Sequence, residues 1–407
     1  MLSPKNISIK DFTYELPEVR IALRPLEQRD QSKLLVWKEE KIQEDKFCNI
    51  AAYIRKGSLM VFNNSKVINA RIRMEKSTGS VIEIFCLEPY GVINDYAVVM
   101  NQKGTSKWKC FIGGASKWKE EYLIKEFNHH GQQIQLRASI SEKQTDAYVV
   151  AFEWMPSSFS FAEILMAVGD IPLPPYIKRL TEMDDADRYQ TIYAKEEGSV
   201  AAPTAGLHFS ENIFQSFAEN NIQKTEVSLH VGAGTFKPVK ADTMEGHEMH
   251  AEWIDVSTAT INNLINQKDD IIAIGTTSLR TIESLYWMGV KTILHPELKQ
   301  LTIGQWDVYD LVEEAEKIDR STALTSLLKW MSSNQKEHIF SQTQLLITPG
   351  YKFRVANALV TNFHQPQSTL LLLVAAAIGN NWRKCYNYAL EHDFRFLSYG
   401  DGSLIFI

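Results

Sequence analysis

DIIAIGTTSLRTIESLYWMG, residues 270–289, gives the clearest indication of the fold class. Its first residues form a short apolar run typical of a buried strand, and Gly275 with two threonines marks a turn. The remainder, SLRTIESLYWMG, has the pattern of a helix. KTEVSLHV at 224–231 predicts another buried strand, and STLLLLVAAAIG at 368–379 predicts another helix. Strands that alternate with helices predict an α/β domain with ligand groups at the strand ends.

Residues 71–154 have a different pattern. They contain VIEIFCLEP, DYAVVM, WKCFIGG, QIQLRASI and AYVVAFEW, which are short β-branched or alternating runs separated by Gly and Asn. This pattern predicts a small antiparallel β-barrel. The residues before it do not look self-sufficient, so we expect the barrel to be an insertion. The expected fold class is therefore α/β: a large α/β catalytic domain of residues 1–65 and 151–407, with an inserted antiparallel β-barrel domain of residues 66–150.

One segment of the large domain differs from the rest, from about residue 298 to about residue 342. It is acidic at DLVEEAEKID and then becomes helical, with Leu324, Leu327, Leu328 and Met331 on one face. We expect this segment to be a surface insertion.

The composition excludes several classes of protein. The 407 residues are 44% hydrophobic and 23% charged, which is typical of a globular protein rather than a disordered chain or a collagen. The four cysteines are scattered without a C-x-x-C motif, which disfavours a disulfide framework and fits a reducing cytoplasm. The N-terminal sequence shows no secretory signal, and the apolar run at 370–378 is too short to cross a bilayer. We expect a cytoplasmic protein without a membrane partner.

The charge is unevenly distributed. The net charge is −6, but residues 66–143 contain 12 Lys and Arg against 8 Asp and Glu, a local balance of +4. Within them, KGTSKWKCFIGGASKWK at 103–119 has five Lys, two Trp and no acidic residue. Lys66, Arg71 and Lys107 are the first candidates for phosphate contacts, and Trp108 either stacks on a base or lies in a core. The alternative is a solvated hairpin whose Trp residues face inward.

Two glycine-containing turns follow predicted strands. In LHVGAGTFKPV, Gly232 and Gly234 allow backbone N–H groups to approach a ligand, and Thr235 adds a hydroxyl. The segment matches neither a Walker loop nor G-x-G-x-x-G, so a tight structural turn is the alternative. In IGTTSLR, Thr276, Thr277 and Arg280 can bind an anion at a helix N-terminus, although either threonine can equally be an ordinary N-cap.

GHEMHAE at 246–252 suggests a metal site formed by His247, His250 and Glu252. The two histidines are three residues apart, whereas a zincin helix requires four, and no Cys lies nearby in the sequence. We therefore expect a metal-independent site in which these histidines form hydrogen bonds near a ligand. An inert surface loop is the alternative.

VAAPTAGLHF at 200–209 predicts a shaped loop, because it combines a proline and a glycine with apolar residues. Thr204, Gly206 and His208 are its candidate pocket residues. His230 lies on a predicted buried strand, where it is either a core histidine or a base.

The C-terminal third adds two further motifs. TNFHQPQSTL places Asn362 and His364 before a proline turn, and SYGDGSLIFI places Tyr399 and Asp401 at a turn. Tyr399 either points into a site or belongs to a C-terminal strand and its turn.

Taken together, these motifs resemble one family. DIPLPPYIKR, YQTIYAKEEGSVAAPTAGLHF, SLHVGAGTFKPV with HEMHAE, IGTTSLRTIES, PGYKF with LVTNFHQPQSTLLLLV, and FRFLSYGD occur in its order. The family is that of the S-adenosylmethionine:tRNA ribosyltransferase-isomerases of queuosine biosynthesis, the QueA family. The resemblance covers nearly the whole chain apart from residues 298–342.

The resemblance implies an enzyme that uses S-adenosylmethionine as a ribosyl donor, without a metal. The ribosyl part is transferred and isomerised onto 7-aminomethyl-7-deazaguanine at the wobble position of a tRNA anticodon loop. The product is epoxyqueuosine-tRNA, and adenine and methionine are released. No obligate protein partner is evident.

The reaction requires a base, an acid and contacts to the tRNA backbone. Histidine suits proton transfer near neutral pH, and the sequence alone does not assign the base among its family-like histidines. The catalytic candidates are His208, His230, His247 and His250. The cofactor-binding candidates are Thr204, Gly206, Gly232, Gly234, Thr235, Thr276, Thr277, Arg280, Asn362, His364, Tyr399 and Asp401. The nucleic-acid-binding candidates are Asn63, Asn64, Lys66, Arg71 and Lys107.

Some positions depart from the family pattern. Lys66 and Asn69 replace an Arg and a Pro, and Gln365 replaces an apolar residue. Lysine retains the charge but loses bidentate phosphate geometry. Two alternatives therefore stay open: a divergent paralogue that uses S-adenosylmethionine on another nucleobase or a small acceptor, and a non-catalytic RNA-binding module.

Overall fold

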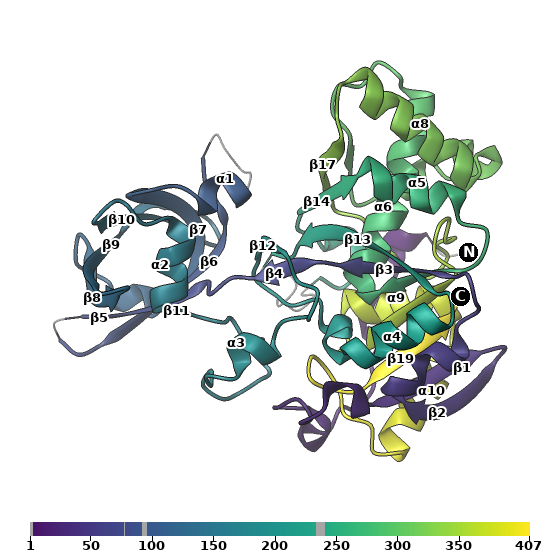
Figure 1. Cartoon of the computed structure of the whole chain (residues 1–407), viewed down its shortest axis with the longest axis horizontal. Coiled ribbons are helices and arrows are strands. Elements are labelled where there is room, and N and C mark those ends of the chain that lie inside the picture. The colour runs from purple at the N-terminus through teal and green to yellow at the C-terminus, as the bar shows by residue number, and fades with distance from the viewer. Residues whose placement is uncertain (1–2, 77, 92–95, 233–240) are drawn as a thin grey trace.

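The computed structural model describes residues 3–76, 78–91, 96–232 and 241–407 (Figure 1). Gly234 and Thr235 lie outside the described residues. A large sheet with helices on both faces forms one module, and a curled antiparallel sheet forms the other. The predicted α/β fold class is therefore confirmed.

The large sheet has ten strands with a parallel centre. Its order is β16 (Thr302–Ile303), β17 (His338–Thr343), β14 (Glu252–Ser257), β13 (Gln223–His230), β3 (Leu59–Asn63), β15 (Ile271–Ile274), β18 (Ala358–Asn362), β19 (Gly402–Phe406), β1 (Lys33–Lys38) and β2 (Lys41–Lys46). Strands β13, β3, β15 and β18 are mutually parallel. All five residues of β3 are buried, as expected for a strand covered on both faces.

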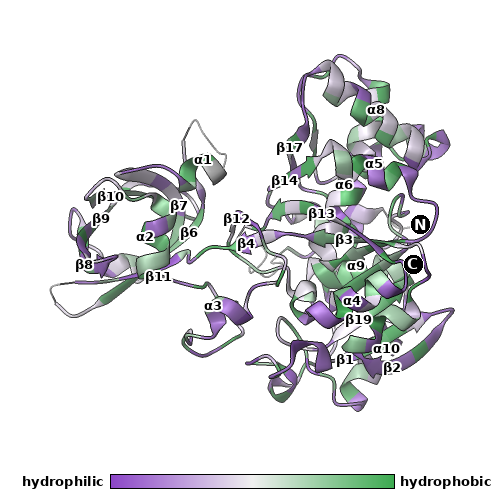
Figure 2. Ribbon diagram, in the orientation of Figure 1, coloured by the Kyte–Doolittle hydropathy of each residue, from purple (hydrophilic) through white to green (hydrophobic). Residues whose placement is uncertain are grey.

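Alternate residues of the central strands face two different helix layers. Val61 and Ala273 pack with α6 (Gly275–Leu294), and this layer also contains α5 (Thr258–Asn266) and α8 (Arg320–Ser333). Phe62 and Ile272 pack on the other face, against α4 (Glu211–Glu219). Helices α9 (Thr369–Ile378) and α10 (Asn381–Glu391) cover the end of the sheet near β1, and α9 is almost entirely apolar (Figure 2).

The expectation of a surface insertion at 298–342 needs correction. This segment supplies β16, α7 (Asp307–Asp310), α8 and β17, so two of its elements are strands of the large sheet. Leu324, Leu327 and Met331 are buried against α6, and Leu328 is partly buried. The apolar face that the sequence predicts is therefore part of the core.

The smaller sheet has seven antiparallel strands. Its order is β11 (Gly169–Asp170), β5 (Arg71–Glu75), β6 (Val81–Pro89), β7 (Thr105–Gly113), β10 (Tyr148–Met155), β9 (Gln132–Lys143) and β8 (Leu123–His129). It curls into a half-barrel in which β8 comes close to β5. Helices α1 (Tyr96–Met100) and α2 (Phe161–Val168) pack with it, and Ser160 and Glu163 form a capping box at the start of α2.

Two strands connect the modules. β4 (Ser65–Val67) leads out of the large sheet, and β12 (Glu196–Ser199) leads back and pairs with β4 in parallel (Figure 1). Between β11 and β12 the chain forms a loop that contains the short helix α3 (Asp185–Arg188). The division into domains at residues 65 and 150 remains our proposal.

Candidate active site

The central parallel strands bring several predicted residues to one edge of the sheet. β3 ends at Asn63, β13 at His230, β15 at Ile274 and β18 at Asn362. The carboxyl ends of parallel strands are the usual ligand side of an α/β sheet. A pocket of about 850 Å³ is located at this edge, which is within the range of about 300–1,000 Å³ for small-molecule sites.

Predicted residues from four separate parts of the sequence line this pocket. They are Thr204, His247, His250, Thr276, Thr277, Arg280, Asn362 and His364. Glu252 also lines it, and Asp146, in the loop between β9 and β10, reaches it from the smaller module. Folding thus brings most of the predicted polar residues together.

The loop VAAPTAGLHF forms one wall of the pocket. Ala201, Pro203 and Thr204 line it, whereas Gly206 lies behind the wall. A Cβ atom at Gly206 would lie 2.0 Å from the hydroxyl of Tyr193, so only glycine fits there. Gly206 therefore shapes the wall by packing and is outside the pocket lining.

His208 is buried below this wall and is outside the pocket lining. Its Nδ1 is 2.8 Å from Ser32 Oγ, and its Nε2 is 3.2 Å from Asn362 Nδ2. Asn362 Oδ1 in turn accepts a hydrogen bond of 2.9 Å from Thr204 Oγ1. Burial lowers the pKa of His208 to about 4, so its ring is neutral and Nε2 accepts from the Asn362 amide. His208 thereby orients Asn362 and Thr204, which both face the pocket.

His247 and His250 lie in an irregular segment before β14, not on a helix. Gln305 holds this segment, because its Nε2 donates to the carbonyl of His247 at 2.7 Å and its Oε1 accepts from Met249 N at 2.9 Å. Burial, and then the charge of His250, lower the pKa of His247. His247 is therefore a neutral proton acceptor at pH 7.

The other two histidines are placed differently. The ring of His230, at the end of β13, stacks on Tyr96 of α1 with the ring centres 5.0 Å apart, outside the pocket lining. His364 lines the pocket, and its Nε2 lies 2.9 Å from Thr361 Oγ1. Burial lowers the pKa of His364 to about 3, which keeps it neutral.

Helix α6 begins at the pocket. Gly275 has a φ of +84°, a backbone conformation that favours glycine, and here β15 changes directly into α6. Ile274 occupies the N-cap position, and within the described part of the chain no side chain caps this end. Thr276 and Thr277 are therefore not N-caps, and both face the pocket. One turn later, Arg280 donates to the carbonyl of Leu345 at 2.9 Å and forms a buried ion pair with Glu252.

Besides Gly206, three more of the expected cofactor residues are outside the pocket lining. Tyr399 donates a hydrogen bond of 2.9 Å to Asp185, and Asp401 accepts from the backbone of Lys33 at 3.0 Å and of Arg395 at 2.7 Å. Both side chains therefore hold C-terminal chain segments in place. Gly232 follows β13 but does not reach the pocket lining.

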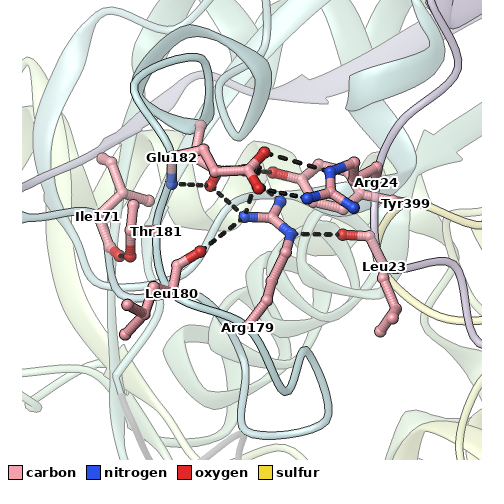
Figure 3. Close-up of polar contacts among 9 residues, drawn as sticks. Leu23, Arg24, Ile171, Arg179, Leu180, Thr181, Glu182 and Tyr399 are labelled. Atoms are coloured by element: carbon pink, nitrogen blue, oxygen red, sulfur yellow. Dashed lines mark hydrogen bonds and ion pairs between the residues drawn. The ribbon is translucent and has the colours of Figure 1, made fainter.

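An aromatic wall that sequence reasoning missed comes from the segments on either side of α3, with Tyr176 before this helix and Tyr189 directly after it. Tyr176 and Tyr189 line the pocket, and the hydroxyl of Tyr176 is 2.5 Å from Ser398 Oγ. Figure 3 shows how Arg179 holds the loop before α3, with its guanidinium between the carbonyls of Leu23 and Leu180. Sequence reasoning could have found Tyr176, because this residue lies in the family-like block DIPLPPYIKR.

The expected nucleic-acid contacts have different environments. Asn63 bonds the backbone of β13 at Leu229, and Asn64 bonds Glu226 and Ser228. Lys66 forms an ion pair with Glu197 at 3.0 Å, and Arg71 forms one with Glu83 at 3.4 Å. Lys107 is exposed on β7 and, in the described ranges, has no ion pair.

Exposed and buried side chains alternate along the first part of β7, and this alternation determines the position of Trp108. Lys107 points outward, whereas Trp108 is fully buried and donates to Ser106 Oγ at 2.9 Å. Trp118 is also buried. The structure therefore favours the core interpretation of these tryptophans over base stacking.

The described residues contain no group of three or more His, Cys, Asp or Glu placed to hold a metal ion. A metal-independent reaction remains a prediction. None of the described helices is long and apolar enough to cross a membrane.

The fold and the pocket define a two-module α/β protein with a site of small-molecule size at the carboxyl edge of its large sheet. Residues 9–405 match the family described as "Queuosine biosynthesis protein", and the chain belongs to that family.

Two curated relatives have the name S-adenosylmethionine:tRNA ribosyltransferase-isomerase. One, from Chelativorans sp. (strain BNC1), is 37% identical over 97% of this chain and 98% of its own length. The other, from Brucella ovis, is 37% identical over 97% of this chain and 96% of its own length. A solved structure titled as an S-adenosylmethionine tRNA ribosyltransferase from Thermotoga maritima is 27% identical, covers 97% of this chain and 99% of its own, and has a TM-score of 0.46.

Proposed function

We propose that this protein is an S-adenosylmethionine:tRNA ribosyltransferase-isomerase. Its substrates are S-adenosylmethionine and a tRNA with 7-aminomethyl-7-deazaguanine at the wobble position. The ribosyl part of the donor is transferred and isomerised to give epoxyqueuosine-tRNA, while adenine and methionine leave. The protein acts in the cytoplasm without a metal.

One observation carries this proposal. Segments at 201–205, 246–252, 275–280, 361–370 and 397–398 are far apart in the sequence, and they converge on one pocket. These segments fall in the blocks that resemble the family, and the whole chain matches relatives that have this enzyme name. The match over nearly the full length of both chains favours the same reaction over a paralogue with a different acceptor.

Among the described histidines that line the pocket, His247 is the one that we assign as the proton acceptor. The reaction needs a base for the acidic proton on the carbon next to the sulfonium. His247 lines the pocket, and its lowered pKa keeps it neutral. His208 has both ring nitrogens within hydrogen-bonding distance of protein groups and lies behind the wall. We therefore assign proton removal to His247 and the orientation of Asn362 to His208.

The pocket also has surfaces that suit a nucleoside. Tyr176, Phe363 and Pro203 supply apolar and aromatic area, and Asn362, Gln365 and Gln367 supply amide groups. Aromatic faces stack on nucleobases, and amides bond to their edges. Adenine of the donor and the deazaguanine of the acceptor both fit this chemistry.

The direct test is an incubation of the protein with S-adenosylmethionine and tRNA that contains 7-aminomethyl-7-deazaguanine, followed by mass analysis of the nucleosides. We expect epoxyqueuosine together with released adenine and methionine. Release of adenine without epoxyqueuosine, and with the ribosyl group found on another acceptor, would support the paralogue. Binding of tRNA without any turnover, unchanged by His247→Ala, would support a non-catalytic module.

A further inference from the structure

A buried cation at the pocket is only partly satisfied by the protein. The side chain of Arg280 is 8% exposed and lines the pocket. Its Nε donates to Leu345 O, and its Nη1 pairs with Glu252, but its Nη2 has no hydrogen-bond partner among the described residues. A buried charged donor without an acceptor is unfavourable, so Nη2 is a position where a ligand acceptor would be stabilised.

The N-terminus of α6 is a second, independent feature of the same place. This helix is 20 residues long, and its first residues, Gly275, Thr276 and Thr277, line the pocket. In the described part of the chain this end has no side-chain cap. An uncapped helix N-terminus presents N–H donors and a partial positive charge. Thr276 and Arg280 are four residues apart, so both lie on one face of α6.

The charges around this position distinguish between possible anions. Glu252 is buried next to Arg280 and also lines the pocket. Its carboxylate repels a phosphate but attracts an ammonium group. A group that contains both a carboxylate and an ammonium therefore matches the Arg280–Glu252 pair better than a phosphate of the tRNA backbone.

We propose that Arg280 Nη2 and the N-terminus of α6 bind the α-carboxylate of the methionyl part of S-adenosylmethionine, with its ammonium on the Glu252 side. This inference rests on the proposed function, because it uses the same donor. It makes Arg280 a specificity residue: the pocket selects the donor with its amino-acid half over nucleosides that lack it. The released methionine has the same two groups and occupies the same place before it leaves.

The test compares two nucleosides that differ only in this half. S-adenosylhomocysteine and methylthioadenosine share adenosine and a neutral sulfur, and only the first has the amino-acid group. Calorimetry with the full chain is expected to show tighter binding of S-adenosylhomocysteine. In the variant Arg280→Gln/Glu252→Gln we expect that affinity, and the affinity for S-adenosylmethionine, to fall about 10- to 100-fold. The affinity for methylthioadenosine is expected to stay unchanged.

The double variant removes both charges together, because loss of Arg280 alone would leave Glu252 buried without its arginine. A second variant, Arg280→Lys, retains the charge but loses the forked geometry, and we expect it to lose the same preference. Arg354→Gln is the matched control. Arg354 also has a buried nitrogen without a partner in the described residues, but it is outside the pocket lining.

The outcomes separate the possibilities. An equal loss for both nucleosides in both Arg280 variants, with thermal unfolding unchanged, would make Arg280 structural and overturn the proposal. Unchanged nucleoside affinities with weaker tRNA binding would assign the position to a tRNA phosphate and overturn it as well. If the wild-type protein binds S-adenosylmethionine but shows no preference for S-adenosylhomocysteine over methylthioadenosine, the carboxylate site is contradicted and the proposed function is not. Wild-type protein that binds none of the three contradicts the proposed function too.

Discussion

At the scale of single residues, the position of His247 in the pocket leads to a prediction about rate and pH. His247→Ala is expected to reduce turnover about 10²- to 10⁴-fold, because it removes the proton acceptor. With His247 as the proposed base, activity requires its neutral form. Its pKa is lowered from 6.5, so we expect the rate to be retained at pH 7 and to fall as the pH drops through that pKa. The pH profile of single-turnover rates checks this expectation.

His250 supplies the matched variant for that profile. Its charge is the second cause of the lowered pKa of His247, after burial. His250→Asn should therefore move the acidic limb to higher pH while the rate at pH 8 changes less than in His247→Ala. A limb that stays in place in His250→Asn, or persists in His247→Ala, would exclude His247 as the titrating group.

The buried histidines predict a loss of stability in mild acid. The pKa of His208 falls from 6.5 to about 4 in the folded protein, and that of His364 falls to about 3. Below pH 6.5 the unfolded chain takes up protons that the folded chain excludes, so the free energy of unfolding decreases as the pH falls towards these folded values. Between pH 7 and pH 5 each histidine should account for about 2 kcal/mol.

Urea unfolding at pH 7 and pH 5 measures this loss. His208→Gln is expected to be less stable at pH 7 but to lose less stability on acidification than the wild type. His295→Gln is the control, because His295 is exposed and its loss should leave the pH dependence unchanged. Equal pH dependence in all three proteins would contradict the burial argument.

At the scale of elements, the loop before α3 connects the pocket wall to the C-terminal segment. Asp185 accepts two hydrogen bonds from Arg179, at 2.6 and 2.7 Å, and one from Tyr399 at 2.9 Å. Beside it, Glu182 pairs with Arg24 on the surface (Figure 3). The loop holds Tyr176 against Ser398 at the pocket. The buried pair Arg179–Asp185 and the exposed pair Arg24–Glu182 therefore allow the effects of a buried and an exposed ion pair on stability to be compared.

Asp185→Asn is expected to lower the free energy of unfolding by about 3 kcal/mol, because it removes one charge of a buried pair. Weaker binding of S-adenosylmethionine should accompany this loss as the wall loosens. Glu182→Gln removes an exposed pair that solvent screens, so it should cost much less stability than Asp185→Asn and leave binding unchanged. Chemical unfolding and calorimetry measure both quantities. A similar small cost for the two variants would show that the buried pair does not hold the loop.

The sequence predicted the elements better than their contacts. The strand, turn and helix at 270–289 became β15, Gly275 and α6, because a buried apolar run and a glycine with positive φ determine local structure. The sequence left the N-cap role of Thr276 and Thr277 open, since capping depends on where the helix begins. Gly206 looked like a ligand contact, but its role follows from the hydroxyl of Tyr193, which no local pattern reveals.

At the scale of the whole molecule, topology explains what the sequence could not predict about the site. The order of strands places β13, β3, β15 and β18 side by side, and their carboxyl ends then form the pocket edge. His208 and Asn362 are 154 residues apart, and their hydrogen bond exists only because β18 passes beside the loop at 204–208. Likewise, the segment at 298–342 has the composition of a surface insertion, but β17 pairs with β14 and draws it into the core.

The distribution of ion pairs over the two modules leads to a prediction about how a chain with a net charge of −6 would hold tRNA. Lys66 and Arg71 are partly neutralised by Glu197 and Glu83, whereas Lys107 is exposed without an ion pair in the described residues.

If Lys107 contacts a phosphate, the logarithm of the tRNA-binding constant falls linearly with the logarithm of the salt concentration, and Lys107→Ala flattens that slope by about one unit. Lys66→Ala should change the slope less, because its charge already has a partner. Filter binding from 50 to 200 mM salt, roughly the range over which such effects are large, measures both slopes. Trp108→Ala should instead lower stability by about 3–5 kcal/mol, as expected for a core tryptophan. An unchanged slope in Lys107→Ala, together with a full unit lost in Lys66→Ala, would place the phosphate contacts on the connecting strand β4 instead of on the half-barrel.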